Sequence, residues 1–239
     1  MRKAIYIHGL GGRGNGSSAQ NVKKLLETEY EFSAATYNLL NPEQAFGQIQ
    51  KDASDAGLVV ASSLGAFYAA SVNICTPILL LNPCLEPEHV IKNILYPEQK
   101  KDFDEEKCRR QWLKIKEGWN LIDHETCGSR FAIFSDNDEL FSFRDVFAKN
   151  FGTFYGTENS CMIHGTHEIA KDEKCLSESL SLFKKYLDVA DSVAGNQSAG
   201  GFGGFDFFEL FAESSYIMHE EAQGEPYKRY VKIPEPRGL

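Results

Sequence analysis

The sequence has no long apolar run and no cysteine pair at metal-binding spacing. No apolar stretch approaches the roughly 20 residues that a helix needs to span a bilayer, and the run within Met1–His8 is too short for a secretory signal. The six cysteines are scattered without a CxxC pair, so neither a disulfide framework nor a zinc site is expected. We therefore expect a cytoplasmic protein without a membrane span.

Basic residues are outnumbered by acidic ones, 25 to 34. The net charge is −9, and lysine and arginine form no stripe along the chain. A protein that binds nucleic acid neutralises phosphates with such residues, so we expect no nucleic-acid partner. The length of 239 residues and an apolar fraction of 42% suit one globular domain with a sizeable core, together with an appendage.

Short apolar runs alternate with helical patterns along the first 190 residues. The predicted strands are near residues 3–8, 34–40, 57–62, 77–83, 130–135 and 159–163. Nearly continuous apolar strands separated by helices are typical of a parallel sheet that is covered on both faces. The fold class is therefore α/β, with a mostly parallel sheet of about six strands.

Two segments depart from this alternation. Residues 84–128 carry charge runs, two tryptophans and several helical stretches, and we interpret them as a helical cap or lid inserted in the 1–190 domain. The glycine-rich composition around 191–204 predicts a linker. The remaining 205–239 form an appendage that is a candidate for protein contact, and the sequence assigns it no further role.

The clearest chemical motif is Ala61-Ser62-Ser63-Leu64-Gly65, between an apolar strand and a small-residue helix. It resembles the G-x-S-x-G nucleophile elbow, in which a sharp turn presents a strained serine. Residues two before and two after that serine must be small because strand and helix approach closely there. Gly65 lies two after Ser63, so the spacing favours Ser63 over Ser62 as the nucleophile.

A glycine-rich loop, His8-Gly9-Leu10-Gly11-Gly12, follows the first predicted strand. Acyl-transfer chemistry needs two fixed donors for a tetrahedral oxyanion. The backbone N–H groups of Leu10 and Leu64 are the candidates for this oxyanion hole. The alternative, a phosphate-binding loop, is disfavoured because neither GxGxxG nor GxxxxGK[ST] fits the segment.

An acid and a base follow later strands. Asp138 is the favoured acid, with Asp136 second, in the turn after 130–135. His167 is the favoured base, with His164 as its rival, after 159–163. The order Ser63, Asp138, His167 is that of the serine, acid and histidine in one hydrolase fold.

Several segments together resemble the α/β-hydrolase fold, and in particular its YqiA-like esterase family, over about residues 3–187. They are Ile5-Tyr6-Ile7-His8-Gly9-Leu10, Ala61-Ser62-Ser63-Leu64-Gly65-Ala66-Phe67-Tyr68-Ala69, Leu80-Leu81-Asn82-Pro83, Asp138-Glu139-Leu140-Phe141-Ser142-Phe143-Arg144 and Gly165-Thr166-His167. The resemblance implies a Ser63–Asp138–His167 triad and an intracellular enzyme that hydrolyses short-chain esters or acyl thioesters. The chain departs from the family at Ala61 and Ser135, where glycine is common, and in an enlarged 84–128 segment.

These observations predict a serine hydrolase that cleaves a small-molecule carboxylic ester or acyl thioester through an acyl-enzyme at Ser63. The mechanism requires no cofactor and no metal. Two alternatives remain at the level of sequence: a catalytically silent hydrolase-fold binding protein, and a peptidase or acyltransferase on the same fold.

Overall fold

Runs of isoleucine, valine, leucine and aromatic residues form the strands of the central sheet. The computed structural model describes residues 1–74, 76–101, 103–122, 130–154 and 157–198. The sheet strands are β1 (Arg2–Ile7), β2 (Tyr30–Ser33), β3 (Leu58–Ser62), β4 (Ile78–Leu81), β5 (Arg130–Ser135) and β8 (Ser160–Ile163). Two further strands, β6 (Thr153–Phe154) and β7 (Thr157–Glu158), form a small antiparallel pair of their own.

All neighbouring strands of the central sheet are parallel, in the order β2-β1-β3-β4-β5-β8. Their register brings the carboxyl ends level, since Ser62 pairs with Leu81 and Ser135 pairs with Ile163. The loops that follow these strands therefore meet at one edge of the sheet. The predicted parallel α/β sheet of about six strands is confirmed.

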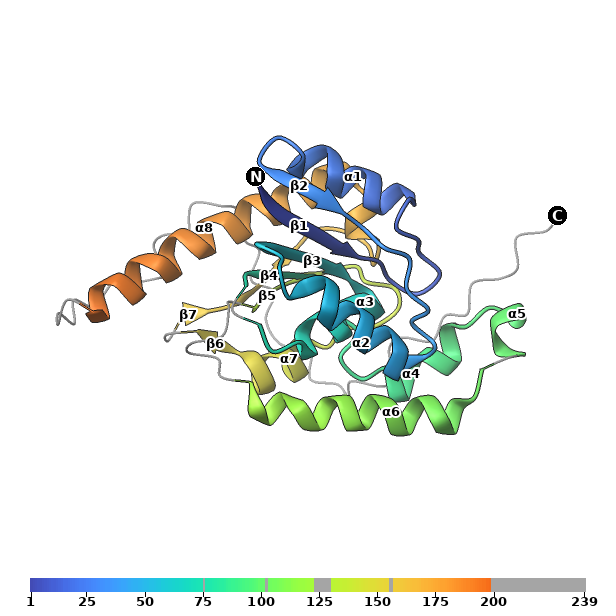
Figure 1. The fold of residues 1–239 in the computed structure, drawn as a ribbon. Helices are drawn as coiled ribbons and strands as arrows, with labels where there is room; N and C mark the ends of the chain where they lie inside the picture. Colours follow the sequence, from blue (N-terminus) through green and yellow to red (C-terminus); the bar gives the residue numbers. More distant parts are fainter. Residues whose placement is uncertain (75, 102, 123–129, 155–156, 199–239) are drawn as a thin grey trace.

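Helices cover both faces of the sheet (Figure 1). They are α1 (Ser17–Leu26), α2 (Pro42–Ala53), α3 (Ser63–Ser71), α4 (Pro87–Ile94), α5 (Pro97–Lys100), α6 (Glu105–Glu117), α7 (Arg144–Phe151) and α8 (Glu173–Ser198), with 3-10 turns η1 (Gly118–Leu121) and η2 (Ile169–Lys171). Alternate strand residues belong to two separate cores, one with α1 and α8 and the other with α2, α3, α7 and the 84–122 helices. This alternation is what a sheet buried on both faces requires.

The predicted strand over 34–40 was wrong, because the second strand ends at Ser33. Beyond it, the Gly14 amide donates to Thr36 Oγ1 at 2.9 Å and the Tyr37 amide donates to the His8 ring at 3.0 Å. The backbone of this segment thus bonds to the loop after β1 rather than to a strand. Tyr37 and Leu39 are nevertheless buried, which explains why the sequence remains apolar beyond the end of β2.

In its described parts, 84–101 and 103–122, the 84–128 segment contains the helices α4, α5 and α6 and the turn η1. Its two tryptophans bond to helix α3: Trp112 Nε1 donates to Tyr68 Oη at 2.9 Å, and Trp119 Nε1 donates to Ser71 Oγ at 2.7 Å. Helix α6 therefore packs outside α2 and α3 as an added layer (Figure 1). Its role as a cap over the site stays a prediction.

The last described helix, α8, extends to Ser198. The predicted linker over 191–204 therefore begins within a helix, whereas residues 199–204 and the appendage 205–239 lie outside the described residues. In the part of the chain that is described, no helix is both long enough and apolar enough to cross a membrane.

Candidate active site

Ser63 stands at the turn between β3 and α3 with a left-handed backbone, φ +51°. A non-glycine residue in this region is strained and persists only where the surroundings impose it. The turn is held by close packing of helix α3 against the end of β1. A Cβ on Gly65 would lie 2.2 Å from the His8 carbonyl oxygen and 2.7 Å from that of Ile7. Only glycine fits there, while Ala61 is accommodated in full burial.

The serine belongs to a chain of hydrogen bonds. Ser63 Oγ lies 2.9 Å from His167 Nε2, and His167 Nδ1 lies 2.8 Å from Asp138 Oδ2. The His167 and Asp138 side chains are only 8% and 3% exposed, so water competes little for these bonds. The three residues favoured from the sequence are thus brought together, from the ends of three different strands.

The turn after β5 holds the acid and the histidine in place. Asp138 Oδ1 accepts hydrogen bonds from the amides of Leu140 and Phe141 at 2.8 and 3.1 Å, which leaves Oδ2 for His167. The Phe141 ring packs edge-on against the imidazole, with ring centroids 4.8 Å apart. The Glu139 carboxylate accepts from the His167 amide at 3.0 Å. Consecutive residues therefore fix both the position and the tilt of His167.

The rival residues lie together elsewhere. His164 Nδ1 is 2.9 Å from Asp136 Oδ2, and the His164 side chain is 85% exposed. Partial burial raises the pKa of Asp136, but the hydrogen bonds from His164 and the Gly165 amide outweigh it and the net shift is downward. Ser62 is also turned away, since its hydroxyl lies 3.0 Å from Tyr6 Oη.

The loop after β1 lies directly against the serine. A Cβ on Gly9 would be 3.0 Å from Ser63 Cβ, so glycine allows this approach. The loop then turns through Leu10 and Gly11, with Gly11 at φ +73° and the Gly12 amide donating to the Gly9 carbonyl at 3.0 Å. Leu64 lies in the first turn of α3, where amides have no partner within the helix. Both predicted oxyanion donors, Leu10 and Leu64, therefore belong to segments adjoining Ser63.

His8 supports this loop, a role that the sequence reasoning missed. Its ring accepts a hydrogen bond from the Tyr37 amide at Nε2, 3.0 Å, and its Nδ1 lies 2.8 Å from the Gly9 carbonyl oxygen. Since a carbonyl only accepts, Nδ1 carries the proton and the imidazole is neutral. Burial lowers the pKa of His8, which favours the same form.

Asn82 belongs to one of the segments that resemble the family, but the sequence assigned no role to its side chain. It follows β4, is 2% exposed and has φ +42°. Its side chain bonds to Ser135 and to the carbonyl oxygens of Thr166 and His167. The signal in the sequence was an asparagine directly after an apolar strand, a residue type that tolerates the left-handed region.

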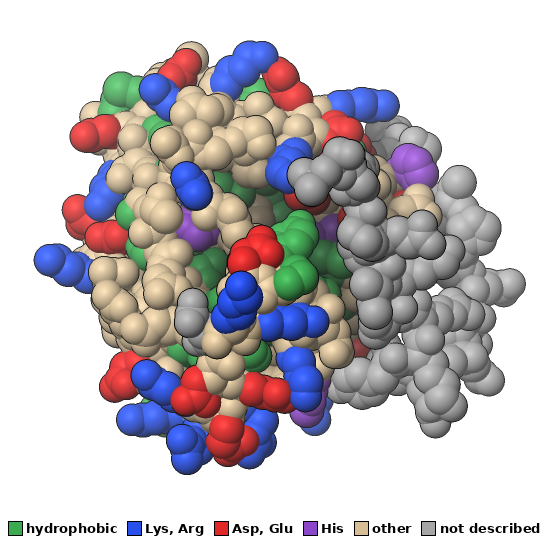
Figure 2. Space-filling view, turned by 90° about the vertical axis from the view of Figure 1, so that its right-hand side faces the viewer, with side chains coloured by type: hydrophobic (Ala, Val, Ile, Leu, Met, Phe, Trp, Pro, Cys, Tyr) green, Lys and Arg blue, Asp and Glu red, His purple; other side chains and the backbone are tan. Residues whose placement is uncertain are grey.

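The surroundings of the serine are mostly apolar. Leu10 and Leu140 are partly buried and pack against the core cluster that contains Leu85 and Phe141. Figure 2 faces the edge at which the strands end, and it shows apolar side chains gathered in a hollow, with histidine side chains beside them. Cys84 is buried there, and burial, aided by the nearby Glu88 and Asp138 carboxylates, raises the pKa of its thiol well above the ordinary value.

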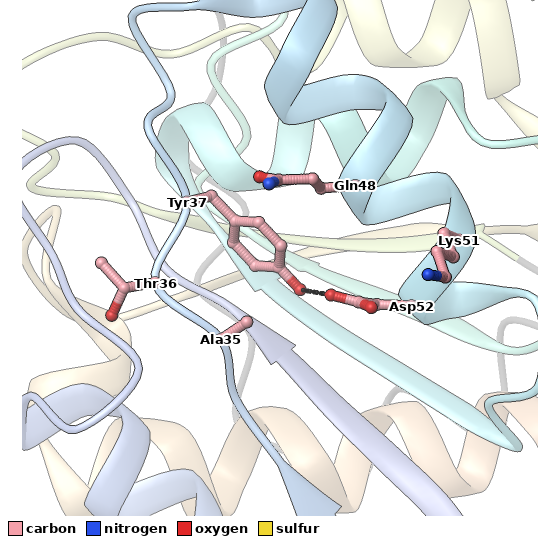
Figure 3. A pocket seen from close by; sticks show the side chains of 6 residues that line it. All are labelled: Ala35, Thr36, Tyr37, Gln48, Lys51 and Asp52. Carbon is pink, nitrogen blue, oxygen red and sulfur yellow. Dashed lines mark hydrogen bonds between the residues drawn. The ribbon is translucent and has the colours of Figure 1, made fainter.

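A separate hollow of about 260 Å³ lies between the segment after β2 and helix α2 (Figure 3). Its lining residues are Ala35, Thr36, Tyr37, Gln48, Lys51 and Asp52. The Tyr37 hydroxyl donates to Asp52 Oδ2 at 2.9 Å, which closes one side of the hollow. None of its lining residues belongs to the hydrogen-bonded chain of Ser63, His167 and Asp138.

Within the described ranges, no group of three or more histidine, cysteine or acidic side chains is arranged to hold a metal ion. The cysteines in those ranges, Cys84, Cys108, Cys161 and Cys175, are free thiols. The described site thus consists of hydrogen-bonded side chains and backbone amides.

A scan of protein family models found no match to the chain, and a search of curated proteins found no significant relative. Solved structures do match. Est1E from Butyrivibrio proteoclasticus is 15% identical, with a TM-score of 0.51 over 78% of this chain and 87% of its own. The capsule O-acetyltransferase of Neisseria meningitidis serogroup A is 12% identical, with a TM-score of 0.51 over 79% of this chain and 88% of its own.

The mouse alpha/beta hydrolase domain-containing protein 10 also matches, at 16% identity and a TM-score of 0.48 over 80% of this chain and 90% of its own. At such identities the likeness concerns the fold, and a fold hosts many reactions. The six-stranded parallel sheet, the sharp turn at Ser63 and the likeness to Est1E together give the conclusion that the chain has an α/β-hydrolase-like fold.

Proposed function

We propose that this protein is a serine hydrolase that cleaves a carboxylic ester or acyl thioester through an acyl-enzyme at Ser63. The observation that carries the proposal is the continuous hydrogen-bonded chain from Ser63 Oγ through His167 to Asp138, at 2.9 and 2.8 Å. A nucleophile within reach of a base, itself oriented by an acid, is the arrangement that activates serine in unrelated hydrolases.

In the proposed reaction, Ser63 Oγ attacks the acyl carbonyl carbon while its proton passes to His167 Nε2. The carbonyl π bond breaks and its electron pair forms an oxyanion, which the amides of Leu10 and Leu64 stabilise. His167 then protonates the leaving alcohol or thiol as its bond to the acyl carbon breaks. Water, deprotonated by His167, attacks the acyl carbon; the bond from that carbon to Ser63 Oγ breaks, and His167 returns the proton to Oγ as the acid leaves. Asp138 keeps Nδ1 protonated throughout and stabilises the imidazolium.

The position of Leu10 and Leu140 near the site supports an apolar acyl group. Their side chains are partly buried and continue the apolar core toward Ser63. Apolar walls with a few polar groups are typical of small-molecule sites. The YqiA-like family resemblance in the sequence points in the same direction, toward short acyl chains.

The test compares the wild-type chain with Ser63→Ala on a panel of activated esters, acyl thioesters and anilides. Ser63→Ala should lower ester or thioester turnover by on the order of 10⁴–10⁶-fold. The matched control is Ser62→Ala, since the neighbouring hydroxyl points toward Tyr6 and should be dispensable. Equal turnover by wild type and Ser63→Ala would contradict the proposal, and turnover of anilides alone would favour a peptidase.

An acyltransferase is the second candidate, because one matching structure is an O-acetyltransferase. The two reactions share the acyl-enzyme and differ in the acceptor. Adding small alcohols to the ester assay distinguishes them: a hydrolase releases mainly the free acid, whereas a transferase yields mainly the new ester. The silent binding protein would show neither product.

A further inference from the structure

Three segments that are distant in the sequence meet next to His167, and the side chain of Asn82 joins them. Asn82 follows β4, Ser135 ends β5, and Thr166 and His167 belong to the loop after β8. Asn82 Nδ2 lies 2.9 Å from Ser135 Oγ, 3.1 Å from the Thr166 carbonyl oxygen and 3.0 Å from the His167 carbonyl oxygen. Its Oδ1 accepts from the Ser135 amide at 2.8 Å.

Both ends of the Asn82 amide are thus used. Ser135 Oγ donates to the Thr166 carbonyl at 2.8 Å, so the serine hydroxyl links the amide to the same loop by a second route. Asn82 is 2% exposed and Ser135 is 4% exposed, so water replaces these bonds poorly. Removing a buried partner leaves the remaining groups unsatisfied, which is more costly than the loss of an exposed hydrogen bond.

The backbone at Asn82 indicates that this arrangement is imposed. Its φ of +42° is one of two left-handed non-glycine conformations among the described residues, and the other is Ser63 itself. The strained asparagine lies one strand away from the strained serine, since β3 and β4 are paired and Ser62 is in register with Leu81. Strain held by surrounding contacts is a feature of functional sites.

Given the proposed function, on which this inference rests, we propose that Asn82 is a positioning residue. Its side-chain amide holds the loop that carries His167 at hydrogen-bonding distance from Ser63. Asn82 touches neither reacting atom, so it acts through the backbone carbonyls of Thr166 and His167. A small displacement of a catalytic base lowers the rate by as much as about 10²-fold.

The decisive variant is Asn82→Gly, because glycine keeps the left-handed backbone while the amide is lost. The matched control is Asn159→Gly. Asn159 is also buried and donates to backbone carbonyls, those of Arg130 and Phe151, but it directly precedes β8, whereas His167 follows that strand.

For Asn82→Gly, kcat should fall by on the order of 10²-fold with little change in KM, while Asn159→Gly should keep the wild-type kcat even if it is less stable. Hydrogen exchange followed by mass spectrometry should show faster exchange of residues 164–168 in Asn82→Gly alone. An unchanged kcat in folded Asn82→Gly, or equal losses in both variants, would overturn the inference.

Two further measurements distinguish a failure of the Asn82 inference from misfolding of the variant and from failure of the proposed function. If Asn82→Gly does not fold, Ser135→Ala replaces it, which removes one link to Thr166 and should give a smaller fall in kcat with faster exchange of 164–168. A wild-type chain without Ser63-dependent turnover would contradict the proposed function. The exchange of residues 164–168 in Asn82→Gly would still decide whether Asn82 holds the loop, since slow exchange there overturns the inference.

Discussion

At the scale of single residues, the histidines His167 and His8 differ in their hydrogen-bonding partners. His167 lies between a serine and a carboxylate, an arrangement suited to carrying a proton. His8 lies between an amide donor and a carbonyl acceptor, an arrangement that only the neutral ring satisfies. Both side chains are buried, so burial alone does not identify a candidate catalytic base. The hydrogen-bonding partners of each ring distinguish the two.

The neutral His8 leads to a pH prediction. Because burial lowers its pKa below the ordinary value of about 6.5, the unfolded chain binds this proton more readily than the folded protein. The contribution of His8 to stability is therefore complete above about pH 6.5 and declines as pH falls toward the lowered pKa.

Urea unfolding of the wild type and of His8→Gln, at about pH 7.5 and about pH 5.5, measures this effect. The wild type should lose more free energy of unfolding between the two pH values than His8→Gln, because glutamine does not titrate. Titration of the other groups affects both proteins alike. The same loss in both proteins would show that His8 does not carry the pH dependence.

At the scale of elements, the strand–turn–helix unit β3–α3 requires a residue without a side chain at position 65. Gly65 faces the carbonyl oxygens of Ile7 and His8, and both would clash with a Cβ. Those oxygens belong to backbone at the end of β1, which is held in the sheet. Because these two carbonyl groups cannot shift, helix α3 must move if Gly65 is replaced.

Gly65→Ala should therefore destabilise the fold by about 1–3 kcal/mol or more and displace Ser63, with a parallel loss of activity. Gly47→Ala in α2 is the control, since nothing lies within 4 Å of a Cβ there. That exposed helical site should gain about 0.5–1 kcal/mol. Chemical denaturation of both variants tests the contrast, and a neutral Gly65→Ala would refute the packing argument.

The sequence predicted the elements that depend on local pattern. Ser63, Asp138 and His167 could be placed together because the carboxyl ends of parallel strands meet at one edge. The 34–40 segment was mistaken for a strand because Tyr37 and Leu39 are buried by other partners. The bonds of Asn82 could not be foreseen, since they join residues 53 to 85 positions apart and depend on a left-handed backbone.

At the scale of the whole molecule, the described members of both cores and of the candidate site lie within residues 4–190. Helix α8 closes one core, where Tyr186 stacks on Phe131 with ring centroids 4.6 Å apart. We propose that residues 1–190 form the hydrolase domain and that residues 205–239 serve a separate role, such as contact with another protein.

A chain that ends at Ser198 should then fold and keep the wild-type kcat. A chain that ends at Asp172 should not fold, because it lacks α8 and exposes the core around Phe131. Circular dichroism and ester turnover of both truncations provide the measurement. Loss of activity on removal of residues 199–239 alone would place those residues in the catalytic unit.

We propose that Ser63 forms a covalent acyl-enzyme. The most direct measurement is reaction of the full chain with a fluorophosphonate probe, followed by peptide mass spectrometry, with Ser62→Ala and Ser63→Ala alongside. One adduct is expected on Ser63 in the wild type and in Ser62→Ala, and none in Ser63→Ala. An adduct on another residue, or an unlabelled wild-type chain, would contradict the proposal.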